Sequence, residues 1–131
     1  MKRKTENSNY VTRIKGIAET FNKAMSYLLL KDPKSFSIFF QSEDEIPNVY
    51  RLSDMMKDNY EVWTDSKIRY ISSIIFLLNA INKDEAIAIY KTFFIKRDAD
   101  WWKDKYSKSG YYRLRDKALE SFFTIVDNKS F

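Results

Sequence analysis

The sequence predicts an all-α protein that folds as a single domain, residues 1–131, with five to six helices. Turn residues are scarce, with only two Gly and two Pro in 131 residues, whereas an all-β sandwich or barrel needs a turn about every 8–12 positions. Apolar side chains recur every three to four positions through most of the chain, which is the spacing of amphipathic helices. Apolar residues make up 44% of the chain and aromatic residues 17%, which is enough for one hydrophobic core.

The first 73 residues are expected to form a flexible basic tail followed by a helical half. Residues 1–8 are basic and polar, without a periodic apolar pattern. Residues 9–73 form the predicted N-terminal helical half, which begins with an amphipathic helix from about Asn9 to Leu30. Pro33 ends this helix, because the residue before a proline avoids the α region.

The stretch 34–47 is the least regular part of the chain. Residues 35–40 are rich in Phe and are predicted to be a short extended segment or an aromatic loop, either packed on the core or used as an interaction patch. The consecutive acids Glu43–Glu45 precede a proline without a histidine nearby, which is more typical of a solvated loop than of a metal site or catalytic acids. A further helix is predicted from about Val49 to Trp63.

Residues 74–126 have the length and order of a helix-turn-helix half. The helix from Ile68 to Ile81 is apolar nearly all round, which places it at the centre of the domain. Asn82, with a Glu three residues later, is a capping pattern for a helix that runs to Ile95. A short helix over 99–106, a Ser-rich turn and a last helix over 111–126 complete the predicted unit.

The composition excludes many kinds of site. The chain has no Cys and no His, which removes disulfides, thiolate zinc sites, cysteine nucleophiles and imidazole general bases. The run 68–81 is about 14 residues long, whereas a membrane-spanning helix needs roughly 20 apolar residues, and the N-terminus has no secretory signal pattern. We therefore expect a cytoplasmic protein that is not an enzyme, has no cofactor and no metal, and does not enter a membrane.

The basic surplus of +5 is densest over residues 105–117, at the start of the last helix. On that helix Tyr111, Leu114 and Ala118 begin a stripe that is expected to be buried, leaving the basic side chains on another face. Hydroxyls, backbone N–H groups and the positive end of the helix dipole suit phosphate oxygens. The candidate DNA-contacting residues are Lys105, Ser107, Lys108, Ser109, Tyr112, Arg113, Arg115, Asp116 and Lys117.

In this hypothesis the Ser and Tyr hydroxyls and Lys108 set the register on phosphates. Arg113 and Arg115 contact base edges or flanking phosphates, and Asp116 orients one of them. Trp101 and Trp102 offer a base-stacking surface, although at least one of them is more typical of a core anchor.

A specific resemblance lies in residues 101–122, WWKDKYSKSGYYRLRDKALESF. This segment resembles the C-terminal signature of ArpU-like phage transcriptional regulators, and a family of small uncharacterised mycoplasma proteins with the same double Trp, YSKS and YYR…A…F elements. More distantly, residues 78–123 are similar to the region 4 helix-turn-helix of sigma factors, although Gly110 stands where those usually carry Thr. The resemblance implies transcriptional regulation in a bacterial cytoplasm.

Two functions from different classes follow. The first is a transcriptional regulator that binds double-stranded DNA, with RNA polymerase or a second copy of the chain as further partners. The alternative is a non-catalytic α-helical protein-interaction module on a helix-turn-helix scaffold. The first predicts that Arg113 and Arg115 are both exposed on a convex face, whereas the second predicts that both are buried in ion pairs or covered by the N-terminal half.

Overall fold

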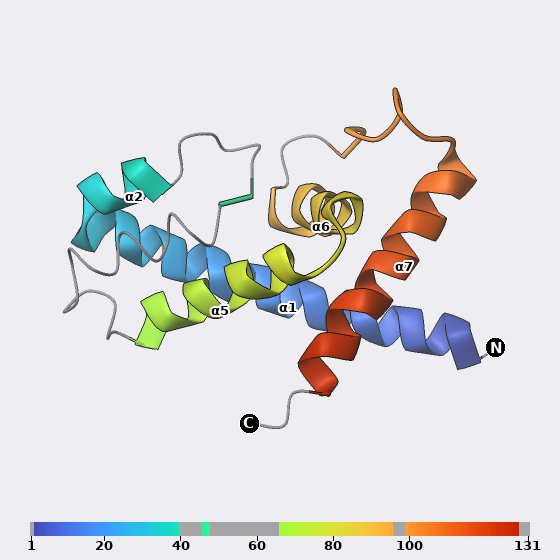
Figure 1. The fold of residues 1–131 in the computed structure, drawn as a ribbon, viewed down its shortest axis with the longest axis horizontal. Coiled ribbons are helices and arrows are strands. Elements are labelled where there is room, and N and C mark those ends of the chain that lie inside the picture. The colour runs from blue at the N-terminus through green and yellow to red at the C-terminus, as the bar shows by residue number, and fades with distance from the viewer. Residues whose placement is uncertain (1, 40–45, 48–65, 96–98, 129–131) are drawn as a thin grey trace.

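The computed structural model describes residues 2–39, 46–47, 66–95 and 99–128 (Figure 1). Within these ranges every regular element is helical, as the composition predicted. The helix predicted at 49–63 and the acidic run Glu43–Glu45 lie outside the described residues, as do the side chains of residues 1–8. None of the described helices combines the length and apolar character needed to cross a membrane.

Helix α1 (Lys2–Lys31) is longer than the sequence predicted. It begins at Lys2 rather than near Asn9, so residues 2–8 continue the helix instead of preceding it. It ends at Lys31, as the following proline predicted, and Pro33 is then the first residue of α2 (Pro33–Phe39). The expectation of an extended segment or loop here is wrong, because proline suits the first position of a helix and the Phe36 N–H bonds to the Asp32 carbonyl at 3.0 Å.

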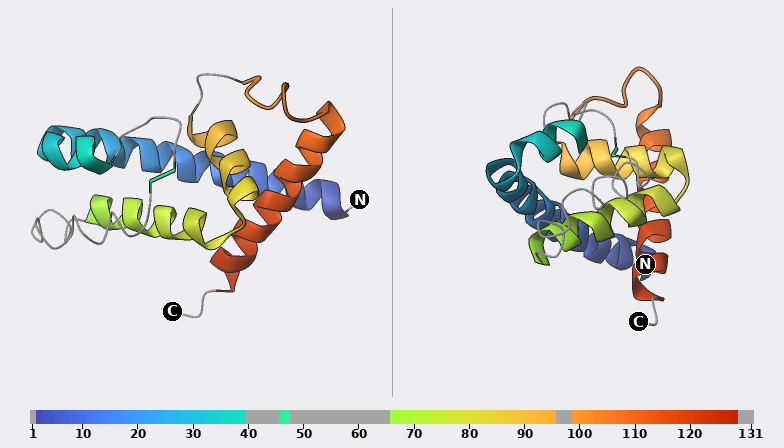
Figure 2. Two further views of the ribbon diagram at one scale, coloured as in Figure 1. Left: turned by 45° about the horizontal axis from the view of Figure 1, so that its top comes forward. Right: turned by 60° about the vertical axis from the view of Figure 1, so that its left-hand side comes forward.

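Helix α1 is the element on which α2, α5 (Ser66–Ala80), the π-helical turn η1 (Tyr90–Phe94) and α7 (Lys108–Asp127) pack (Figures 1 and 2). Helix α5 runs antiparallel beside the C-terminal part of α1. Helix α7 crosses the N-terminal part of α1 at a steep angle. Helix α6 (Lys83–Ile89) and η1 fill the angle between α1 and α7.

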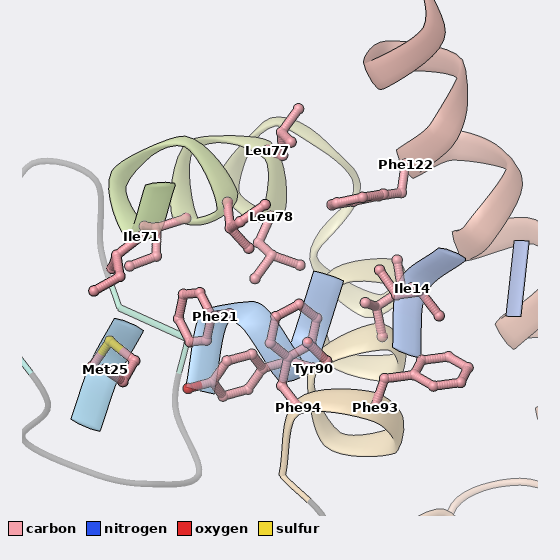
Figure 3. Close-up of a cluster of buried hydrophobic side chains, with 14 of the residues drawn as sticks. Ile14, Phe21, Met25, Ile71, Leu77, Leu78, Tyr90, Phe93, Phe94 and Phe122 are labelled. Atoms are coloured by element: carbon pink, nitrogen blue, oxygen red, sulfur yellow. The ribbon is translucent and has the colours of Figure 1, made fainter. Parts of the chain in front are cut away.

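The core lies where α1, α5, α6, η1 and α7 meet (Figure 3). Its largest fully buried side chains are Phe21, Phe122, Phe123, Ile14, Leu28, Ile68, Ile71, Ile75, Leu78, Ile89 and Leu119. The sequence placed the 68–81 helix at the centre, and its Ile and Leu residues are buried except for Ile81, which follows the end of α5 and is partly buried. However, Phe76 on the same helix is 55% exposed, and α1 is the helix that contacts α2, α5, η1 and α7.

The start of α6 confirms one half of the predicted capping pattern. The side chain of Asn82 accepts a hydrogen bond from the Asp84 N–H at 2.9 Å. In a capping box the Glu side chain also accepts a hydrogen bond from the backbone N–H of the N-cap residue. Glu85 does not accept this bond from the Asn82 N–H. It is buried instead, and its Oε2 accepts a hydrogen bond at 2.9 Å from the Ser121 hydroxyl of α7. This carboxyl therefore joins two helices rather than capping one.

Residues 99–105 form successive turns and not the predicted short helix. Their hydrogen bonds include Lys103 N–H to Asp100 O at 3.1 Å and Tyr106 N–H to Trp102 O at 2.9 Å. Adjacent side chains on a regular helix point about 100° apart, whereas here Trp101 and Trp102 both pack on the ring of Tyr111. The middle helix of the predicted helix-turn-helix is thus absent from this segment, and the set of helices differs from the prediction.

Candidate nucleic-acid interface

Helix α7 begins with a side-chain cap. The Ser107 hydroxyl accepts a hydrogen bond from the Gly110 N–H at 3.1 Å, so it is committed to the helix. A Cβ added at Gly110 would lie 3.0 Å from that hydroxyl oxygen, which is tighter than ordinary packing. A larger residue at this position would therefore crowd the Ser107 cap.

Four of the predicted cations lie just before α7 or in its first three turns, and all four are exposed to solvent. These are Lys105, Lys108, Arg113 and Lys117, and in the described part of the chain none of them forms an ion pair. Ser109, Arg113 and Lys117 are spaced four residues apart, so they lie along one ridge of the helix. We call these exposed residues at the start of α7 and along this ridge, Lys105, Lys108, Ser109, Arg113 and Lys117, the α7 basic ridge.

Arg115 lies apart from this ridge. Its guanidinium is 4.8 Å from the ring centre of Tyr112, and its Nη2 is 3.3 Å from Asp116 Oδ1. The side chain is only 23% exposed, and its Nε is buried without a hydrogen-bond partner among the described residues. Asp116 does pair with one of the two arginines, but Arg113 alone is presented to solvent. DNA binding predicted that both arginines are exposed, and the interaction module predicted that both are buried. In the structure Arg113 is exposed and Arg115 is mostly buried.

An aromatic brace holds the 99–106 turns against α7. Trp102 stacks on Tyr111 with ring centres 4.6 Å apart and planes 6° from parallel, and Trp101 meets the same ring edge-on at 5.9 Å. The Tyr111 and Thr92 hydroxyl oxygens are 2.7 Å apart, and Trp101 Nε1 donates to Thr92 at 3.3 Å. Burial raises the pKa of Tyr111, against smaller opposing effects of Thr92 and the Arg115 charge. The sequence predicted that Tyr111 is buried but gave no sign of its partner Thr92.

A second contact fixes α7 on α1. Arg13 donates from both terminal nitrogens to Asp127, at 2.7 and 3.1 Å, and lies 4.2 Å from the ring centre of Phe123. Tyr10 stacks on the same Phe ring, with centres 4.9 Å apart. The hydrogen bond with Arg13 lowers the pKa of Asp127, and the same bond raises the pKa of Arg13. Sequence reasoning missed this contact because its partners are 114 residues apart.

The described residues contain no group of three acidic side chains placed to hold a metal ion. Comparisons with family models, curated proteins and solved structures find no match for this chain. The likeness to ArpU-like regulators and to sigma region 4 therefore stays a prediction, and the function must be argued from the surface itself.

Proposed function

We propose that the protein binds double-stranded DNA through the α7 basic ridge and acts as a bacterial transcriptional regulator. The observation that carries the proposal is the set of four exposed, unpaired cations around the first turns of α7, Lys105, Lys108, Arg113 and Lys117. Lys and Arg contacts to phosphates supply most of the affinity of proteins for DNA, and this affinity does not depend on the base sequence.

The helix start adds directional contacts to this charge. The first N–H groups of a helix have no acceptor within the helix, and the helix dipole favours an anion there. Ser107 takes up one of these N–H groups, that of Gly110, while the exposed hydroxyl of Ser109 stands beside Lys108 at the same end. Phosphates at this end of α7 orient the helix toward a groove, and Arg113 contacts a phosphate that flanks this groove.

The transcriptional part of the proposal rests on the resemblance of residues 101–122 to ArpU-like regulators. The hydroxyl of Ser107 serves as the cap, and Arg115 contacts DNA only if it leaves Tyr112 and Asp116. Lys105, Lys108, Ser109, Arg113 and Lys117 are therefore the side chains that we assign to DNA.

The test is the affinity for a random-sequence duplex at low salt, measured by fluorescence anisotropy. We expect Lys108→Gln/Arg113→Gln to weaken binding by about tenfold or more, because two phosphate contacts are lost. A matched control removes two exposed cations near the other end of the molecule, Lys23→Gln/Lys34→Gln, and leaves the affinity nearly unchanged. Equal losses in the two variants, or no binding by the wild type, contradict the proposal.

A further inference from the structure

A cavity of about 540 Å³ opens behind the α7 basic ridge, between α1, η1, the 99–102 turns and α7. Its volume lies within the range of small-molecule sites, roughly 300–1,000 Å³. Aromatic and cationic side chains share its lining. They are Lys15, Lys91, Phe93, Trp102, Tyr111, Tyr112 and Arg115. None of them belongs to the set of side chains assigned to duplex DNA above.

The charge of the lining favours an anion. Three cations border the cavity, Lys15 from α1, Lys91 from η1 and Arg115 from α7. Asp100 is the one acidic side chain of the described lining, and it pairs with Lys103 at 3.1 Å. Lys15 is exposed, and the ammonium of Lys91 lies 5.6 Å from the ring centre of Trp101. Arg115 pairs with Asp116, but no described carboxylate pairs with Lys15 or Lys91, so the positive charge of this lining is only partly balanced.

Arg115 carries hydrogen-bonding capacity that its present neighbours do not use. Its Nε–H has no acceptor in the part of the chain that the structure describes, and its contact with Asp116 is long, at 3.3 Å. A buried donor without an acceptor is unfavourable. A rotation of the side chain toward the cavity lets Nε and a terminal nitrogen donate together to one phosphate, the paired geometry in which arginine binds such anions best.

The aromatic lining supplies a planar contact surface that is already fixed. Trp102 is stacked on Tyr111 at 4.6 Å, and its Nε1 donates to the Ala99 carbonyl at 3.1 Å. A planar ring in the cavity can continue such stacking without reordering these side chains. We propose that this cavity binds a nucleotide, a planar aromatic base joined to a phosphate, with the base against the Trp102 and Tyr112 side of the lining and the phosphate between Lys15, Lys91 and Arg115.

The test is isothermal titration of the full chain with deoxyadenosine 5′-monophosphate, deoxyadenosine and inorganic phosphate. The nucleotide is expected to bind at least about tenfold more tightly than either half alone, because only it engages both the rings and the cations. Binding of deoxyadenosine as tight as that of the nucleotide overturns the proposal. So does the lack of saturable binding at about 5 mM nucleotide.

Variants locate the site. Lys15→Gln/Lys91→Gln alters side chains at the rim and is expected to weaken nucleotide binding by about tenfold. Arg115→Lys keeps the charge but removes the paired donors, and is expected to weaken it as well. Lys105→Gln/Lys117→Gln is the matched control on the α7 basic ridge and should leave nucleotide binding unchanged while it weakens duplex binding. Unchanged affinity in Lys15→Gln/Lys91→Gln, with its melting temperature preserved, contradicts the proposal.

A further measurement distinguishes a free nucleotide from the 5′ end of a DNA strand as the ligand. A single strand of four deoxyadenosines with a 5′-phosphate binds more tightly than the mononucleotide if the site receives the end of a strand. It binds more weakly if the site is made for a free nucleotide. Either order supports the cavity as a nucleotide site, provided that Lys15→Gln/Lys91→Gln weakens the binding. If this variant leaves the affinity for the strand unchanged, the strand binds elsewhere and the strand-end assignment is wrong.

Discussion

Tyr111 is the residue on which the attachment of the 99–106 turns depends, and two substitutions separate its contributions. The side chain is 5% exposed, its ring contacts both tryptophans, and its hydroxyl lies 2.7 Å from that of Thr92. Tyr111→Phe keeps the ring and removes one hydrogen bond, so the free energy of unfolding should fall by about 1 kcal/mol. Tyr111→Ala also removes the buried ring, and the loss should be about 3–5 kcal/mol.

Thermal unfolding followed by circular dichroism measures both losses. At about 4 °C per kcal/mol for a chain of this size, the melting temperature should fall by about 4 °C in Tyr111→Phe and by more than about 12 °C in Tyr111→Ala. The neighbouring Tyr112 is 41% exposed, so Tyr112→Ala is the control and should cost about 1 kcal/mol or less. The brace is refuted if Tyr111→Ala is no more destabilising than this control, or if Tyr111→Phe costs as much as Tyr111→Ala.

Three further predictions concern stability. Gly16→Ala should raise the free energy of unfolding by about 1 kcal/mol in a denaturant titration, because Gly16 lies inside α1 and an added Cβ meets nothing within 4 Å. A loss of stability would show that the space beside Gly16 is not open. Ser121→Ala should lower the free energy of unfolding by about 1–3 kcal/mol, since the buried Glu85 carboxyl loses its hydrogen-bond donor. An unchanged denaturation midpoint would contradict a stabilising role of the Ser121–Glu85 hydrogen bond. Asp127→Asn should lower the melting temperature at neutral pH. Because the pKa of Asp127 is lowered in the folded protein, the stabilisation is complete above the unfolded pKa of about 4 and is lost as the pH falls through the lower folded value. The difference between wild type and Asp127→Asn should therefore vanish in strong acid, and a constant difference at every pH would contradict the role of the charge.

The local features of the fold were predictable because short-range patterns determine them. Pro33 marked the end of α1, Asn82 marked the start of α6, and apolar spacing located α5 and α7. Predictions were wrong where contacts between residues that are far apart in the sequence determine the structure. Glu85 follows Asn82 at the spacing of a capping box, but it is buried against Ser121, 36 positions away.

The exposure of the candidate DNA-binding side chains was also predictable only where the pattern along one helix determines it. Spacing placed Arg113 outside the buried stripe of α7, and it is exposed. The stripe itself is wider than predicted, because α6 and α1 both cover α7 and bury Leu119 and Phe123 as well. Arg115 follows the buried Tyr111 by four residues and precedes the buried Leu119 by four, so it lies on this face and its side chain is only 23% exposed. Which face of α7 is covered depends on where α1 and α6 pack, and the sequence of one helix does not contain that information.

The salt dependence of duplex binding tests the central claim most directly. Four phosphate contacts, one for each exposed cation of the α7 basic ridge, give a slope of about −3.6 for log K against log salt, so affinity should fall about 150-fold between about 50 and 200 mM salt. Arg113→Gln/Lys117→Gln should reduce the slope to about −1.8, and the fall over the same range to about 12-fold. If the wild type and this variant have the same slope, the α7 basic ridge is not the surface that binds DNA.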